Sequence, residues 1–179
     1  MRQIDDTGLV DAVPACETGG CRTVRVGPLV VAADHPSLDD DIARFAVGLR
    51  AERRYFGPRA AANPKPFPSL IERISVRGSG FRFAAIDEGR VIGLARIDEP
   101  GEMLIAVAEH RRGQGVGKVL AGAAVERARE LGYRRLLMRS SRRSRAARAM
   151  GETMGFMVVD QGRGRIDLIL DLSPASYSA

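Results

Sequence analysis

Apolar positions in the middle of the chain predict three strands. Over residues 81–85 the chain alternates in a strand-like way, and a second such run follows the turn Asp87-Glu88-Gly89 over residues 91–97. Residues 103–108 are continuously apolar, and this run is too short for a helix and lacks a helical stripe, which favours a buried strand. We therefore expect three antiparallel strands in succession.

The N-terminal half predicts a strand followed by two helices. Residues 23–33 alternate and then run apolar, with an interruption at Gly27-Pro28, so we expect a first strand with a bend. Ser37 and the three aspartates after it suit the start of a helix, which helical apolar spacing extends to about Tyr55. A proline-rich stretch then breaks regular structure before a short helix over residues 70–76.

The C-terminal half predicts two more helices and three strands. After Gly117, apolar residues recur on one helical face until Gly132 closes the helix, and residues 136–138 form the next strand. A helix over about residues 144–154 ends at Gly155. Two strands, over residues 156–160 and 166–172, then pair across a turn.

Length and composition indicate one domain. The chain has 179 residues, of which 45% are hydrophobic, and a domain of this size can bury a core. We assign the domain to residues 22–172, a flexible tail without periodicity to residues 1–21, and a short C-terminal tail to residues 173–179.

Several observations predict a cytoplasmic protein that does not associate with membranes. Two cysteines cannot form the disulfide framework of a small secreted domain, so a reducing compartment is expected. The N-terminus carries acidic residues instead of a signal peptide, and no apolar run approaches the ~18 residues of a membrane span. His35 and His110 lack the closely spaced partners of a zinc site, so we expect no metal.

The basic charge of the domain leaves several partners open. The net charge is +6, and because residues 1–21 hold one Arg and four acids, the rest of the chain carries +9. This balance suits nucleic acid, an acidic partner or a polyanionic cofactor. Aromatic residues make up only 5% of the chain and Trp is absent, which argues against a stacking platform for single-stranded nucleic acid.

The most informative segment joins the strand that ends near Ala108 to the helix after Gly117. Glycines at 113, 115 and 117 allow close approach to the backbone, and the positive end of the helix points into the turn. A pyrophosphate is the natural ligand, although a glycine-rich turn can also be a simple tight connection. A P-loop would need Ser or Thr at Val119, and a dinucleotide-binding fingerprint would need Gly at Lys118, so the sequence excludes both.

The pattern R-x-x-G-x-G at Arg112, Gly115 and Gly117 resembles the acyl-CoA loop of GNAT N-acetyltransferases. The resemblance covers about residues 22–172, and Ser144, Ala147 and Gly155-Phe156 stand where such proteins usually have Asn, Ala and Gly-Phe. It implies an α/β GNAT fold, a central twisted mixed β-sheet flanked by helices. Acetyl-CoA is expected in the gap where two strands diverge.

The resemblance also implies site residues. The main chain of Val107 is expected to bind the pantetheine arm, and the Ile105 N–H to stabilise the charge that develops on the attacked carbonyl oxygen. The remaining residues expected to bind acetyl-CoA are Arg112, Gly113, Gln114, Gly115, Val116, Gly117 and Ser144.

A transferase of this kind needs a base, because a lysine-type amine with a pKa of ~10.4 is protonated at neutral pH. The spacing of Glu102 from Arg112 resembles that in bacterial protein-lysine acetyltransferase domains, where such a glutamate is the base. The alternative is a solvated turn acid beside Glu99. Many GNAT enzymes have a Tyr acid four residues before the position of Gly155, where this chain has Gly151.

The function expected from the resemblance is transfer of an acetyl group from acetyl-CoA to a primary amine, in a small molecule or a protein lysine. Residues 45–56 resemble the first helix of protein acetyltransferases, which makes protein lysine one candidate acceptor. Rival hypotheses are an acyl-CoA sensor without turnover and, with less support, a nucleic-acid-binding protein. Both a monomer and a dimer are compatible with the sequence.

A run of five arginines lies at the end of one predicted strand and the start of the last helix: Arg139, Arg142, Arg143, Arg145 and Arg148. This arginine run is either a solvated face or a site for the 3′-phosphate of CoA, an acidic substrate or nucleic acid.

Overall fold

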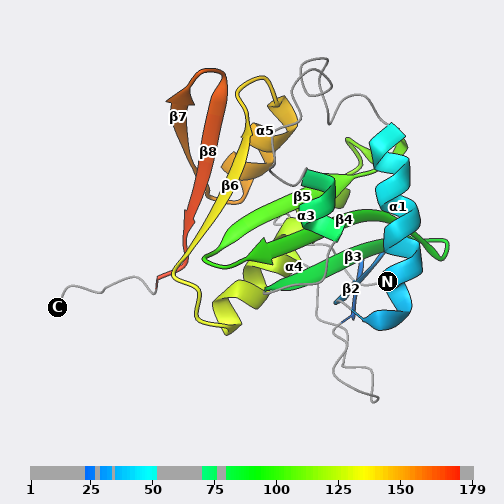
Figure 1. The fold of residues 1–179 in the computed structure, drawn as a ribbon. Helices are drawn as coiled ribbons and strands as arrows, with labels where there is room; N and C mark the ends of the chain where they lie inside the picture. Colours follow the sequence, from blue (N-terminus) through cyan, green and yellow to red (C-terminus); the bar gives the residue numbers. More distant parts are fainter. Residues whose placement is uncertain (1–22, 27–28, 34, 52–69, 76–79, 174–179) are drawn as a thin grey trace, which may run out of the picture.

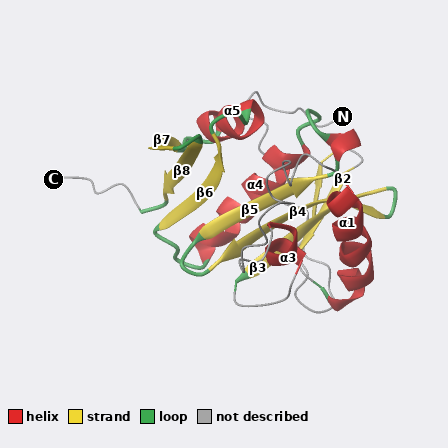
Figure 2. Cartoon of the chain, turned by 45° about the horizontal axis from the view of Figure 1, so that its top comes forward, coloured by secondary structure: helices red, strands yellow, loops and turns green. Residues whose placement is uncertain are grey.

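The fold is a mixed sheet with helices on both faces (Figures 1 and 2). The computed structural model describes residues 23–26, 29–33, 35–51, 70–75 and 80–173. Its strands are β1 (Thr23–Val26), β2 (Leu29–Ala33), β3 (Phe81–Asp87), β4 (Arg90–Asp98), β5 (Glu102–Val107), β6 (Arg135–Ser141), β7 (Met157–Gly162) and β8 (Arg165–Asp171). Its helices are α1 (Asp39–Ala51), α3 (Leu70–Ser75), α4 (Val116–Glu130) and α5 (Arg145–Thr153), with 3-10 turns at Pro36–Leu38 and Glu109–Arg111.

The sheet has eight strands in the order β1-β2-β3-β4-β5-β6-β8-β7. Neighbouring strands are antiparallel except for β5 and β6, which run parallel. The predicted succession β3, β4 and β5 is therefore confirmed, and so is the α/β class with a central mixed sheet flanked by helices. β5 and β6 are parallel because the connection between them, which contains α4, returns the chain to the same end of the sheet.

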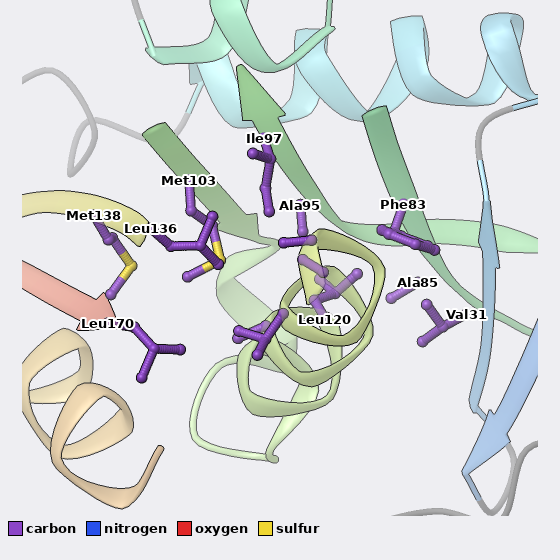
Figure 3. Packing of buried hydrophobic residues seen from close by; sticks show 14 of the residues in the cluster. Val31, Phe83, Ala85, Ala95, Ile97, Met103, Leu120, Leu136, Met138 and Leu170 are labelled. Carbon is purple, nitrogen blue, oxygen red and sulfur yellow. The ribbon is translucent and has the colours of Figure 1, made fainter. Parts of the chain in front are cut away.

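Two hydrophobic clusters hold the helices to the sheet. Alternation along β5 sends Met103 to the cluster under α4 and Leu104 to the cluster under α1 and α3. Figure 3 shows side chains from β2 to β6, among them Phe83, Met103 and Leu136, gathered on the side of Leu120 of α4. A Cβ at Gly93 of β4 would lie 2.9 Å from Leu120 Cδ1, so this glycine permits the close packing of α4.

The N-terminal strand prediction is wrong in one respect. Residues 23–33 form two strands, β1 and β2, which pair antiparallel with Val26 opposite Leu29. β1 and β2 therefore run in opposite directions, where the sequence suggested one bent strand. Helix α1 is described as far as Ala51, and its predicted continuation to Tyr55 lies outside the described residues, as do residues 1–21 and 174–179.

None of the helices in the described ranges is long and apolar enough to span a membrane. Within those same ranges, no group of three or more His, Cys, Asp or Glu side chains is arranged to hold a metal ion.

Candidate functional site

A gap opens between β5 and β6, the parallel strands in the middle of the sheet. Their described register contains one pair, Glu102 opposite Leu137, and the Leu137 N–H donates to the Gly101 carbonyl at 2.9 Å. Beyond this pair the two strands diverge (Figure 1). The edge of β5 that follows Glu102 is therefore released from the sheet ladder.

The main chain of β5 presents polar groups to this gap. Val107 lies opposite Gly93 of β4, and the Ala108 N–H donates to the Ile92 carbonyl at 2.9 Å. Because neighbouring residues of an antiparallel strand direct their N–H and C=O groups to opposite edges, those of Ile105 and Val107 point away from β4 and toward β6. This is the edge on which the sequence analysis expected both residues to act.

The chain leaves β5 through the glycine loop, residues 112–117, and enters α4. Gly113 and Gly115 have φ values of +75° and +81°, a region that glycine adopts without strain. An added Cβ at either position would meet no atom within 4 Å, so these glycines are required by the backbone conformation and not by packing. The surface of the loop is accordingly open for a ligand to approach.

The start of α4 supplies unused donors. The Val119 N–H donates to the Gly115 carbonyl at 3.1 Å, and Gly115 caps the helix without a side-chain hydrogen bond. The amides of Val116, Gly117 and Lys118 precede that bond, so they have no carbonyl one turn earlier in the helix. Free amides beside the positive end of a helix are an arrangement that can bind an anion.

Side chains of the loop brace its backbone. Arg112 Nε donates to the Val107 carbonyl at 3.1 Å, and Gln114 Nε2 donates to the His110 carbonyl at 2.9 Å. The contribution of Arg112 and Gln114 to a bound anion would thus come mainly from the main chain. Arg111, which no sequence motif marks, pairs with Asp87 at 2.6 Å and attaches the segment before the loop to the β3–β4 turn.

Glu102 lies in a cluster of ion pairs, here called the Glu102 cluster: Arg73, Asp98, Glu102 and Arg139. Arg73 donates to both Glu102 oxygens, at 3.2 and 3.0 Å, and also to Asp98 at 3.1 Å. Arg139 Nη1 donates to Glu102 Oε2 at 3.2 Å. The hydrogen bonds that Arg73 donates to Glu102 raise the pKa of Arg73, against the opposing effect of burial.

This geometry excludes the interpretation of Glu102 as a solvated turn acid. Its side chain is only 16% exposed, and both oxygens accept from guanidinium groups. The partners Arg73 and Arg139 were not linked to Glu102 by the sequence analysis. No local pattern could have linked them, because they lie 29 and 37 residues away in the chain.

Helix α5 flanks the glycine loop. Ser144 caps this helix, its hydroxyl accepting from the Ala147 N–H at 3.3 Å. A Cβ on Gly117 would lie 3.8 Å from the sulfur of Met150, which puts α5 beside the first turn of α4. Gly151 faces the core, where a Cβ would lie 2.5 Å from Cδ2 of the fully buried Leu168. A tyrosine at this position would require β8 or α5 to move.

Gly151→Ala is expected to lower the free energy of unfolding by about 1 kcal/mol. Overpacking typically costs about 1–3 kcal/mol, which exceeds the gain of about 0.5–1 kcal/mol from replacing a helical glycine. Gly122→Ala in α4 is the matched control, because a Cβ there meets no atom within 4 Å; it should raise stability by about 0.5–1 kcal/mol. Urea denaturation of both variants checks this, and shifts of equal sign would contradict the packing at Gly151.

The arginine run does not form one uniform patch. Arg139 belongs to the Glu102 cluster, and Arg142 Nη1 pairs with Asp160 Oδ2 at 3.2 Å. The arginine run itself contains no acidic residue, and folding brings Glu102 and Asp160 to it. Arg143 and Arg145 are exposed at the start of α5.

Comparison with protein families gives one match. The model of the acetyltransferase (GNAT) family matches residues 49–156, more than half of the chain. This range includes β5, the glycine loop, α4, β6 and α5. No curated protein sequence matches the chain.

Solved structures share the fold at low sequence identity. The GNAT domain of S. lividans PAT has a TM-score of 0.64 and 19% identity, covering 84% of this chain and 96% of that chain. Salmonella typhimurium yncA with its cofactor acetyl-CoA has a TM-score of 0.63 and 16% identity, covering 86% and 98%. The ribosomal-protein-S18-alanine N-acetyltransferase from Escherichia coli has a TM-score of 0.59 and 17% identity, covering 84% and 98%.

Proposed function

The chain belongs to the GNAT acetyltransferase family, and from this premise we propose that it transfers an acetyl group from acetyl-CoA to a primary amine. The observation that carries the proposal is the junction of an open β5–β6 gap with an uncrowded glycine loop that leads into the N-terminus of α4. The gap can hold the extended arm that carries the thioester, and the glycine loop can bind the diphosphate. Family membership alone would leave open whether these parts are intact in this chain.

The residues present fit acetyl-CoA. The amides of Val116, Gly117 and Lys118 suit a pyrophosphate, and the main chain of Ile105 and Val107 borders the gap. The loop residues Arg112, Gly113, Gln114 and Gly115 shape this site, and Ser144 caps α5, the helix whose Met150 lies near Gly117. Bound there, acetyl-CoA would supply an acetyl group activated as a thioester.

We assign the base to Glu102. A lysine-type amine has a pKa of ~10.4 and must lose a proton before its nitrogen can attack a carbonyl carbon. Glu102 is the carboxylate at the head of the gap, and Arg73 and Arg139 fix its orientation. It would take the amine proton directly or through a water molecule, while the Ile105 N–H would stabilise charge on the carbonyl oxygen.

No side chain at position 151 would protonate the departing thiolate, since Gly151 faces Leu168. The nitrogen–carbon bond forms as the carbon–sulfur bond breaks, the amine proton leaves through Glu102, and the thiolate takes a proton from solvent. A thiol of pKa ~8.5 is an adequate leaving group, so the missing acid would lower the rate without preventing transfer. The same feature supports the second candidate, an acyl-CoA sensor without turnover.

A thiol-release assay separates the two candidates. Acetyl-CoA is incubated with the protein and a panel of free amino acids, polyamines and lysine peptides, and free thiol is measured over time. The proposed enzyme should release thiol only when a suitable amine is present. A sensor would show a raised melting temperature with acetyl-CoA and no amine-dependent release. A protein that shows neither response is not an acetyl-CoA-dependent transferase.

A further inference from the structure

A small cavity adjoins the Glu102 cluster. Its volume is about 360 Å³, and it is lined by Arg139, Gln161, Arg165 and Asp167. Arg139 belongs both to this cavity and to the cluster, because its Nη1 donates to Glu102 Oε2 at 3.2 Å. A molecule in the cavity would therefore be one side chain away from the carboxylate that we assign as the base.

Strand alternation puts the charged residues of the cavity on one face of the sheet. Ile166 and Leu168 of β8 point into the cluster under α4, so Arg165 and Asp167 point to the opposite face. On β6, Met138 points into the same core, and Arg139 lies directly opposite Asp167 in the β6–β8 register. Glu102 shares this face, because its neighbour Met103 packs under α4.

The fourth residue reaches the cavity through an irregularity. The register of β7 with β8 shifts between Asp160 and Gly162, and Gln161 is the residue left over. Such bulges change the direction of a side chain and occur frequently beside active sites. Gln161 adds an amide, which can both donate and accept, to a wall otherwise made of charged groups.

Two charged side chains of the cavity have no partner among the described residues. In the part of the chain that the structure describes, no hydrogen bond or ion pair joins the side chain of Asp167 or of Arg165 to another residue. Arg139, the cross-strand neighbour of Asp167, is directed to Glu102 instead. Asp167 is half-buried, and residues two apart on a strand lie about 7 Å from each other, so a carboxylate and a guanidinium stand close together facing the same space.

From this arrangement, and resting on the proposed transferase function, we propose that the acceptor is a small primary amine that also carries a carboxylate, of the size of a free amino acid. Its ammonium group binds Asp167 before Glu102 removes the proton. Its carboxylate binds Arg165, with Gln161 as a further donor. A volume of about 360 Å³ suits such a molecule, and ligand pockets of ~300 Å³ and more are typical of small-molecule sites.

The test compares free amino acids with their methyl esters, which keep the amine and lose the negative charge. We expect the native protein to acetylate at least one free amino acid with a kcat/KM at least about tenfold above that of its ester. Arg165→Gln should remove this preference mainly by raising KM for the free acid, with the ester little affected. Asp167→Asn should weaken both substrates. Arg163→Gln, in the exposed β7–β8 turn and outside the cavity lining, is the matched control and should behave as the native protein.

The outcomes separate this inference from the function on which it rests. Acetylation of esters, polyamines or lysine peptides without any preference for a carboxylate would overturn the inference and leave the transferase intact. A carboxylate preference that survives Arg165→Gln would overturn the role of the cavity. Failure to acetylate any amine in the panel would overturn both proposals.

Discussion

Replacing Gly115 by valine is expected to abolish measurable binding of acetyl-CoA. Gly115 has a φ of +81° and caps α4, and a β-branched residue does not adopt this conformation without strain. The variant should turn the loop so that the amides at the start of α4 no longer converge. Losing two charge-assisted hydrogen bonds of about 1.5–3 kcal/mol each raises Kd by about 10²-fold or more.

Gly89→Val is the matched control for this experiment. Gly89 lies in the β3–β4 turn with a φ of +74°, and a Cβ there also meets no atom within 4 Å. The two variants therefore carry a similar backbone strain at different places. Isothermal titration should show near-native affinity for Gly89→Val and none for Gly115→Val. Equal losses in both variants would mean that the effect comes from stability and not from the loop.

The second large effect is expected for Glu102→Gln, which should lower turnover by about 10²-fold while acetyl-CoA still binds. Glutamine keeps the size of the side chain and part of its hydrogen bonding to Arg73, and it removes the basicity. The loss should shrink as pH rises toward the amine pKa of ~10.4, because more of the acceptor then arrives deprotonated. A pH–rate profile from pH 6 to 10 measures both features.

Asp98→Asn provides the comparison for the Glu102 variant. Asp98 pairs with the same Arg73 and lies opposite Glu102 in the β4–β5 register. Its replacement removes a carboxylate from the Glu102 cluster without removing the proposed base, so the pH profile should keep its shape. Native turnover of Glu102→Gln at all pH values would eliminate Glu102 and leave a water relay or the acceptor itself to remove the proton.

The sequence predicted those parts of the site that depend on neighbouring residues. The glycines at 113, 115 and 117 predicted an open turn before a helix, and the short apolar run of β5 predicted a buried strand, because these properties are local. The positions of Ile105 and Val107 at the edge of the gap follow from the same strand alternation. For this reason the order of buried strand, glycine loop and helix was predicted correctly.

The parts that were missed depend on contacts between distant segments. The pairing of Glu102 with Arg73 and Arg139 requires α3 and β6 to meet at the head of β5, and Arg142, which follows β6, pairs with Asp160 of β7 only because β8 brings the two segments together. The position of Gly151 against Leu168 likewise depends on how α5 packs on β8. Only the assembled sheet creates these contacts. The hairpin of β1 and β2 was missed because an interruption at Gly27-Pro28 suits a bend and a reversal equally well.

Hydrogen–deuterium exchange with and without acetyl-CoA tests the central claim most directly, because it reports both binding and its location. If acetyl-CoA occupies the β5–β6 gap and the glycine loop, the amides of residues 105–107 and 113–118 should exchange more slowly in its presence. Helix α1, on the other face of the sheet, should serve as an internal reference with unchanged exchange. Unchanged exchange at the loop with millimolar acetyl-CoA, or protection confined to another part of the chain, would contradict the claim.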